Sequence, residues 1–241
     1  MLDIDSDRND LELREITEPP GRFAAGEFMD KLGASDATLM SLVQAIVRDD
    51  AALLSQLLAA SPALAAASFK QGASRREAQA YYLEECGYYL YAGATALHAA
   101  AAGYRTEITR QLISTGADVR ARNRRGAEPL HAAVVGLPGS RMWNPPAQAA
   151  TVRYLIAAGA DPNAVDMDGV TPLHRAVRTR CAAAVQALLE GGADPECRNH
   201  NGSTAMLLAT QNTGRGGSGS PEAKAQQMEI VRLLEQHGAT R

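Results

Sequence analysis

The chain has 241 residues, of which 46% are hydrophobic and 21% charged, and its formal net charge is −3. This composition is typical of a soluble globular protein and excludes a collagen-like or wholly disordered chain. No window approaches the roughly eighteen consecutive apolar residues of a membrane-spanning helix, and the three cysteines without a CxxC pair argue against both a disulfide framework and a zinc ribbon.

Residues 1–35 match no repeat of the chain and include Pro19-Pro20. Seven acidic and two basic residues fall within residues 1–20, so this part carries −5 and the rest of the chain +2. The first ten residues are acidic where a secretory signal has a basic region and then an apolar core, so we expect a cytoplasmic protein. We predict an acidic, partly disordered tail with a capping helix near 23–32.

Residues 38–70 predict a pair of helices. They contain the segment LVQAIVRDDAALLSQLLAASPA, in which Leu42 and Leu57 are fifteen residues apart. Leu97 and Leu112 have the same spacing in the next part of the chain. The segment is therefore interpreted as the first unit of a repeat series, although it lacks the phrase that marks the later units, as a terminal repeat can.

An insertion of 22 residues follows, at 71–92, and it concentrates the aromatic residues. Five of the seven tyrosines lie here: Tyr81, Tyr82, Tyr88, Tyr89 and Tyr91. One interpretation is a local core that folds the insertion back on the helices. The other is a contact surface, because tyrosine is favoured at binding interfaces. Side chains alternate along an extended segment, so we expect Tyr89 and Tyr91 to pack together and Tyr88 to face outward.

From residue 95 onward, two phrases recur with a base period of 33 residues. The first is Thr95-Ala96-Leu97-His98, Glu128-Pro129-Leu130-His131, Thr171-Pro172-Leu173-His174 and, degraded, Thr204-Ala205-Met206-Leu207. The second is Gly116-Ala117-Asp118, Gly159-Ala160-Asp161, Gly192-Ala193-Asp194 and Gly238-Ala239-Thr240. The interval lengthens by ten residues in one unit and by thirteen in another. Repeats of this period are typical of solenoids.

Each repeat predicts two antiparallel helices and a turn. Thr171 before Pro172 is a helix start, because threonine caps a helix and proline fits its first turn. Ile108 and Leu112 share one face of a second helix, which Gly116 ends. An Asn-x-x-Gly or Asp-x-x-Gly turn follows. A single unit cannot bury both of its sides, so the units must stack.

The phrase, the period and their common phase resemble the ankyrin repeat family over residues 38–241. The resemblance implies an all-α solenoid of stacked helix-turn-helix units with β-turn fingers, as a five-repeat cytosolic protein of the bacterial type. The repeats are predicted at about 38–70, 93–125, 126–168, 169–201 and 202–241, within a domain at 36–241. The extra residues of two units fall between their helices, at 136–148 and about 211–223.

Two motifs suggest metal binding but are interpreted as structural. The repeat histidines His98, His131 and His174 line up along the stack, and in the ankyrin family this histidine hydrogen-bonds near the finger and tethers adjacent units. Asp166-Met167-Asp168-Gly169 resembles part of a calcium loop, but Ala164 and Arg175 stand where the first and twelfth ligands belong. We predict an ordinary finger turn there and no metal site.

Arginine supplies 21 of the 24 basic residues and forms two candidate binding clusters. The first lies in the finger at 118–126 and is expected, with the five tyrosines, to contact a protein partner: Arg120, Arg122, Arg124 and Arg125. The second falls at equivalent helix-turn positions, beside glycine-rich residues 214–220, and is expected to bind an anion: Arg141, Arg178, Arg180 and Arg215. Guanidinium groups suit carboxylates and phosphates. Solvated surface charge and a flexible loop are the plainer interpretations.

The sequence contains no nucleophile paired with a base and no cofactor fingerprint, and Glu84 and Glu85 oppose a reactive thiolate at Cys86. We therefore expect no enzyme activity and no cofactor. The resemblance implies a module that binds a protein partner through its concave surface and fingers. The alternative is a receptor for a small anionic molecule, using the inter-helix insertions and the arginine edge. An acidic partner surface suits the arginines, while a charge of +2 does not favour nucleic acid.

Overall fold

Helix pairs repeat along the chain because the same start and stop signals repeat. The computed structural model describes residues 34–74, 77–136, 138–139, 142–211 and 220–240. The inner helices of the pairs are α3 (Ala34–Val47), α5 (Ala96–Ala102), α7 (Pro129–Ala133), α9 (Pro172–Arg178) and α11 (Ala205–Thr210). Their outer partners are α4 (Ala51–Ala60), α6 (Thr106–Ser114), α8 (Pro145–Ala157), α10 (Ala182–Glu190) and α12 (Pro221–Gln236).

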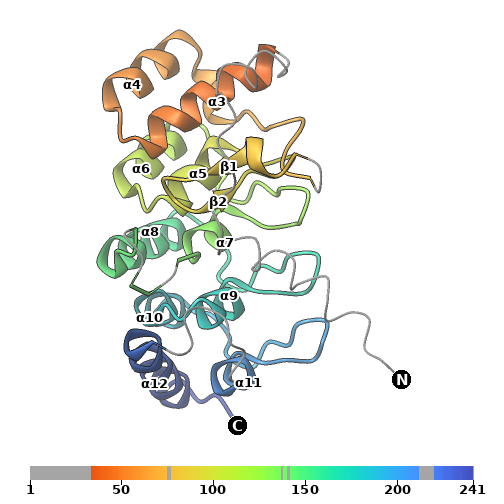
Figure 1. Ribbon diagram of the computed structural model, residues 1–241, viewed down its shortest axis with the longest axis vertical. Helices are drawn as coiled ribbons and strands as arrows, with labels where there is room; N and C mark the ends of the chain where they lie inside the picture. The colour runs from red at the N-terminus through yellow and green to blue at the C-terminus, as the bar shows by residue number, and fades with distance from the viewer. Residues whose placement is uncertain (1–33, 75–76, 137, 140–141, 212–219, 241) are drawn as a thin grey trace.

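The pairs stack along one axis, with the outer helices on one side and the finger turns on the other (Figure 1). Two short 3₁₀ helices, η2 (Pro62–Ala65) and η3 (Gln79–Tyr81), and two strands, β1 (Tyr82–Leu83) and β2 (Tyr88–Tyr89), join the first two pairs. This arrangement confirms the predicted all-α solenoid. Residues 1–33, which include most of the predicted tail and its capping helix, lie outside the described residues, and α3 already begins at Ala34.

The Thr-Pro-Leu-His phrase starts an inner helix by satisfying the N–H groups of its first turn. In α9 the His174 N–H donates to the Thr171 Oγ1 at 3.3 Å, and Pro172 stands where no N–H donor is needed. The Thr171 N–H in turn donates to His174 Nδ1 at 3.2 Å. The same bond to Nδ1 joins Thr95 to His98 and Glu128 to His131. The phrase is therefore a local device that fixes where each inner helix begins.

Each repeat histidine also ties its own unit to the next one. Because Nδ1 accepts a hydrogen bond, the ring proton resides on Nε2, which donates to a carbonyl of the following finger. The acceptors are Ala127 for His98 at 3.0 Å, Val170 for His131 at 3.1 Å and Ser203 for His174 at 2.9 Å. All three rings are buried. The predicted tethering role is confirmed.

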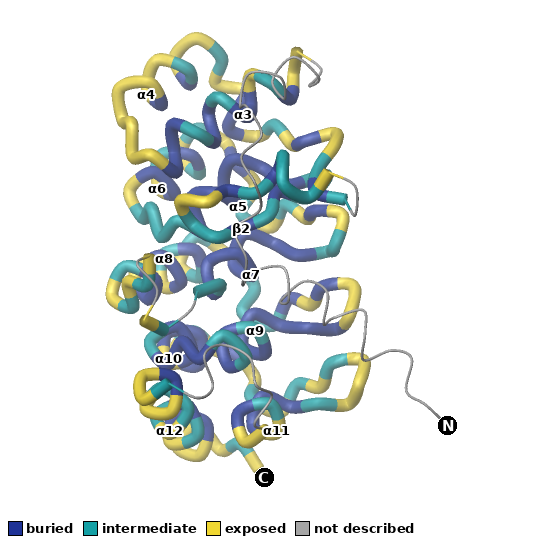
Figure 2. The backbone as a smooth tube through the Cα atoms, in the orientation of Figure 1, coloured by how far each residue is buried: buried dark blue, intermediate teal, exposed yellow. Residues whose placement is uncertain are grey.

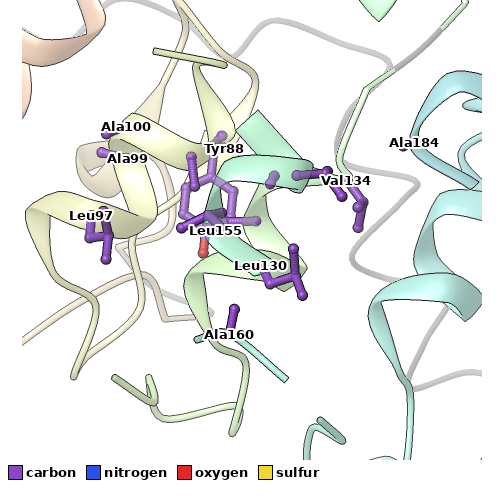
Figure 3. Packing of buried hydrophobic residues seen from close by; sticks show 14 of the residues in the cluster. Tyr88, Leu97, Ala99, Ala100, Leu130, Val134, Leu155, Ala160 and Ala184 are labelled. Atoms are coloured by element: carbon purple, nitrogen blue, oxygen red, sulfur yellow. The ribbon is translucent and has the colours of Figure 1, made fainter. Parts of the chain in front are cut away.

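Leucine and alanine fill the interior of the stack. Leu97, Leu130 and Leu173, the third residues of the phrase, are at most 1% exposed. Residues 99–102 of α5 are all alanine and all buried, so small side chains let neighbouring helices approach closely. Leu97, Leu130 and Leu155 belong to one buried cluster (Figure 3). The inner helices α5, α7 and α9 are buried almost throughout, whereas the finger tips and the outer faces of the outer helices are exposed (Figure 2).

Three turns between paired helices place a residue other than glycine in the left-handed region. Asp49, Tyr104 and Arg180 have φ angles of 61°, 56° and 58°. This conformation costs roughly 1–2 kcal/mol for such residues. Each of the three side chains also makes a hydrogen bond to the next unit. Asp49 accepts from Arg105 at 3.2 Å, the Tyr104 hydroxyl donates to the Val135 carbonyl, and Arg180 donates to the Ala209 and Gln211 carbonyls at 3.0 and 3.1 Å.

The Arg180 turn yields a stability prediction. Arg180→Ala is expected to lower the free energy of unfolding by about 2–3 kcal/mol, because two charge-assisted hydrogen bonds are lost while the strained φ remains. Arg180→Gly is expected to be about 1 kcal/mol more stable than Arg180→Ala, because glycine adopts this φ without strain. Urea unfolding of both variants measures the difference. Equal stabilities would contradict a strained turn.

The extra residues between helices become helix in part. Two insertions are predicted at 136–148 and about 211–223, but α8 already begins at Pro145 and α12 at Pro221. Asn144 and Ser220 cap these helices with their side chains, and a proline occupies each first turn. The loops between these paired helices are therefore shorter than the insertions predicted from the repeat intervals, because the last residues of each insertion are helical.

Candidate binding site

The insertion at 71–92 is held against the stack by hydrogen bonds at its start and by a ring contact further along. Asp36 of α3 accepts hydrogen bonds from the N–H groups of Lys70 and Gln71, at 3.0 to 3.2 Å. The rings of Phe69 and Tyr81 meet edge to face, with centroids 6.5 Å apart. Tyr81 is only 1% exposed. The hairpin of β1 and β2 is therefore a fixed part of the surface beside the fingers.

The register of the hairpin decides which tyrosines face the core. Tyr82 pairs with Tyr89 and Leu83 with Tyr88, and directly opposed residues share one face of the hairpin. Leu83 and Tyr88 face the core, at 5% and 6% exposed, and Tyr88 lies within the buried cluster (Figure 3). The outward placement predicted for Tyr88 is therefore wrong, because alternation alone does not set which face is buried.

The other face of the hairpin carries the more accessible tyrosines. The rings of Tyr82 and Tyr89 lie 4.7 Å apart, and Tyr82, Tyr89 and Tyr91 are all partly exposed. The cluster thus divides into two roles. Tyr81 and Tyr88 belong to the core, while Tyr82, Tyr89 and Tyr91 are half-buried at the surface.

A pocket of about 140 Å³ lies between the hairpin, two successive fingers and an inner helix. We call it the groove pocket. It is lined by Tyr88, Tyr89 and Tyr91 from the hairpin, by Arg125 from one of the fingers, and by Arg175 and Arg178 from α9. The structure therefore brings together members of the tyrosine cluster, of the finger arginine cluster and of the second arginine cluster, which the sequence treats as separate sites.

Carboxylates hold two arginines of the groove pocket in position. Arg175 donates to Asp166 Oδ2 at 2.7 Å, and Arg125 donates to Asp168 Oδ2 at 3.4 Å. Burial opposes the ionisation of Asp166, but the Arg175 guanidinium and backbone N–H donors outweigh it, and the pKa of Asp166 is lowered. The Arg125 guanidinium lies 5.9 Å from the centroid of the Tyr91 ring. The pocket therefore combines positioned cations with an aromatic wall.

The remaining finger arginines make hydrogen bonds within the protein, to backbone carbonyls and to a carboxylate. Arg120 donates to the Gly159 carbonyl at 2.8 Å, Arg122 to Glu128 Oε1 at 3.1 Å, and Arg124 to the Ala73 carbonyl at 2.5 Å. The last bond joins the finger to the hairpin insertion. These side chains are nevertheless exposed along much of their length, so their part in partner contact stays a prediction.

The second arginine cluster does not form one exposed edge in the described residues. Arg178 lines the groove pocket, whereas Arg180 is 2% exposed and donates to two carbonyls of the next unit. The left-handed backbone conformation of Arg180 directs its side chain inward, so its guanidinium group binds carbonyls of the next unit and not a ligand at the surface. Arg141, Arg215 and glycine-rich residues 214–219 lie outside the described residues.

Sequence reasoning did not single out Arg175 or the anchoring role of Asp166. Asp166 does start a finger turn, as predicted, because its carboxylate accepts the N–H groups of Asp168 and Val170 at 3.0 and 2.9 Å. The same carboxylate also binds Arg175. A signal was present: Arg175 and Arg178 are three residues apart in a helix that begins at Pro172, so they share a face.

Other chemistry finds little support in the described residues. Burial, together with the charge of Glu85, raises the pKa of the Cys86 thiol to about 12, which disfavours the reactive thiolate. No group of three or more His, Cys, Asp or Glu side chains in the described ranges is arranged to hold a metal ion. In the same part of the chain, no helix has both the length and the apolar character that crossing a bilayer requires.

Two family models match the chain. The model described as Ankyrin repeats (3 copies) matches residues 146–240, and the model described as Ankyrin repeat matches residues 92–124. Together these ranges cover more than half of the sequence and include the arginines of the groove pocket except Arg125, which follows the second range directly. Strands β1 and β2 lie outside both ranges. A comparison with curated proteins finds no match.

Proposed function

Because the chain belongs to the ankyrin repeat family, we propose that it is a non-catalytic module that binds a protein partner in the groove between its inner helices, fingers and hairpin. Repeats of this family generally mediate protein–protein interaction. The stack suits this role because its surface residues can vary without disturbing the core. The free cysteines Cys86, Cys181 and Cys197 support a cytoplasmic location as part of the proposal.

The groove pocket is the observation that carries this proposal. Its lining combines tyrosine and arginine, two of the residue types that dominate binding energy at protein interfaces. Tyr89 and Tyr91 are partly exposed at its wall, and Arg125 and Arg175 are positioned by carboxylates. The hairpin adds this aromatic wall to a stack whose inner helices and fingers supply the rest.

Tyr91→Ala tests the proposal once a partner has been captured with the intact chain as bait and purified. The variant is expected to weaken partner binding about tenfold or more, because an interfacial tyrosine typically contributes over about 1 kcal/mol. Its melting temperature should change little. Tyr154→Ala is the matched control, since Tyr154 lies on outer helix α8, where Arg110 lies 4.5 Å from its ring centroid. It should bind as the wild type does.

Two results would contradict the groove as the binding surface. The first is a Tyr91→Ala variant with wild-type affinity beside a Tyr154→Ala variant that loses the partner. The second is a loss of stability in Tyr91→Ala as large as that of Tyr81→Ala, which removes a ring that is 1% exposed. In that case Tyr91 belongs to the core of the insertion.

A further inference from the structure

We propose that the groove pocket recognises a carboxylate side chain in an extended acidic segment of the partner, an inference that rests on the proposed protein-binding function. The pocket lies where the hairpin, two fingers and α9 meet, and three guanidinium groups line it. The planar fork of a guanidinium group binds a carboxylate through two parallel hydrogen bonds. The positive charge and the fork shape of these groups therefore favour a partner that presents a carboxylate.

The charges of the lining favour a carboxylate over a phosphate. Arg125, Arg175 and Arg178 line the pocket together with Asp166 and Asp168, so these five side chains sum to one positive charge. A carboxylate brings one negative charge and balances that sum. A phosphate group brings about −1.5 to −2, which exceeds that sum and leaves the occupied pocket with a net negative charge.

Two of the three cations, Arg175 and Arg125, have partners within the pocket before a ligand arrives. The Asp166 carboxylate fixes the Arg175 guanidinium at 2.7 Å, and Asp166 is itself held by the N–H groups of Asp168 and Val170. Arg125 is held between Asp168 and the Tyr91 ring. Side chains that are already ordered lose less conformational entropy on binding. This arrangement raises the affinity for a ligand that matches it.

The size of the groove pocket sets the form of the ligand. With a volume of about 140 Å³, the groove pocket has room for a single side chain of a partner. An extended segment presents alternate side chains on one face. An acidic residue directed at Arg175 and Arg178 therefore places the residue two positions away on the same side, against Tyr89 or Tyr91. We expect that residue to be apolar or aromatic.

Selection from a library of random twelve-residue peptides displayed on phage tests the inference on the full-length chain. We expect enriched peptides to share one Asp or Glu, two positions from an apolar or aromatic residue. Arg178→Glu is expected to weaken binding of these peptides at least about tenfold and to select peptides with Lys or Arg at that position. Arg153→Glu on α8 is the matched control, because Arg153 is an exposed arginine of an outer helix. It should bind the wild-type peptides unchanged.

Each other outcome overturns the inference. Peptides enriched without a fixed acidic position, equal binding by Arg178→Glu and the wild type, or no enrichment at all would each exclude acid recognition by the groove pocket. A selected peptide that binds more tightly when phosphoserine replaces its acidic residue would exclude the carboxylate. If these results appear while Tyr91→Ala still loses the captured partner, protein binding in the groove stands and only the acidic specificity fails.

Discussion

Leu130→Ala is expected to lower the free energy of unfolding by about 2–5 kcal/mol, because it removes buried methyl groups and leaves a cavity in a packed interior. Leu130 is fully buried within the cluster that contains Leu97 and Leu155. Urea unfolding with an unchanged m-value measures the loss.

Leu207→Ala is the matched control for this truncation. Leu207 stands at the histidine position of the degraded phrase and is 45% exposed, so its truncation should change stability by no more than about 0.5 kcal/mol. A Leu130→Ala variant as stable as Leu207→Ala would contradict the placement of the phrase at the centre of the stack.

Lowering the pH from 7 to 5 is expected to destabilise the folded chain steeply. Burial lowers the pKa of His98 to about 4 and that of His131 to about 3, and it lowers the pKa of His174 as well. An unfolded histidine has a pKa of about 6.5, so near pH 5 the unfolded chain binds protons that the folded chain does not. The stability that the neutral rings provide is complete above about pH 6.5 and is lost as the pH falls toward their folded pKa values. His98 and His131 together give a slope of about 2–3 kcal/mol per pH unit near pH 5, and the lowered pKa of His174 acts in the same direction.

His98→Asn isolates one part of this pH dependence. Urea unfolding at several pH values between 5 and 7 should show a slope that is smaller by about 1 kcal/mol per pH unit, because one titrating ring is gone. Leu130→Ala serves as the control, since it lowers stability but keeps every histidine, and its slope should equal that of the wild type. A wild-type slope in His98→Asn would show that the ring takes up protons equally in the folded and unfolded states.

The helix pairs could be predicted from sequence because their signals are local. Thr171-Pro172 specifies a helix start within a few residues, and the 33-residue period repeats that signal along the chain. The faces of the hairpin could not be predicted in the same way. Strands β1 and β2 have two residues each, and only their packing on the stack determines that Tyr88 rather than Tyr89 is buried.

The groove pocket could be predicted only in its parts. The clusters that contain Tyr89, Arg125 and Arg178 are visible in the sequence, but stacking brings them together from three separate parts of the chain. The sequence predicts Arg180 at an exposed edge, but the residue is buried. Its burial depends on a left-handed turn, and arginine gives no local signal for that conformation.

The left-handed turns give the series of units a fixed order. Their residues are a carboxylate at Asp49, a phenol at Tyr104 and a guanidinium at Arg180, and each one finds its partner on the unit that follows. Deleting or duplicating one unit would bring Asp49 against a residue other than Arg105, or would turn Arg180 away from the helix end that it caps. This chain has junctions that are not interchangeable, so its length is constrained by its own connections.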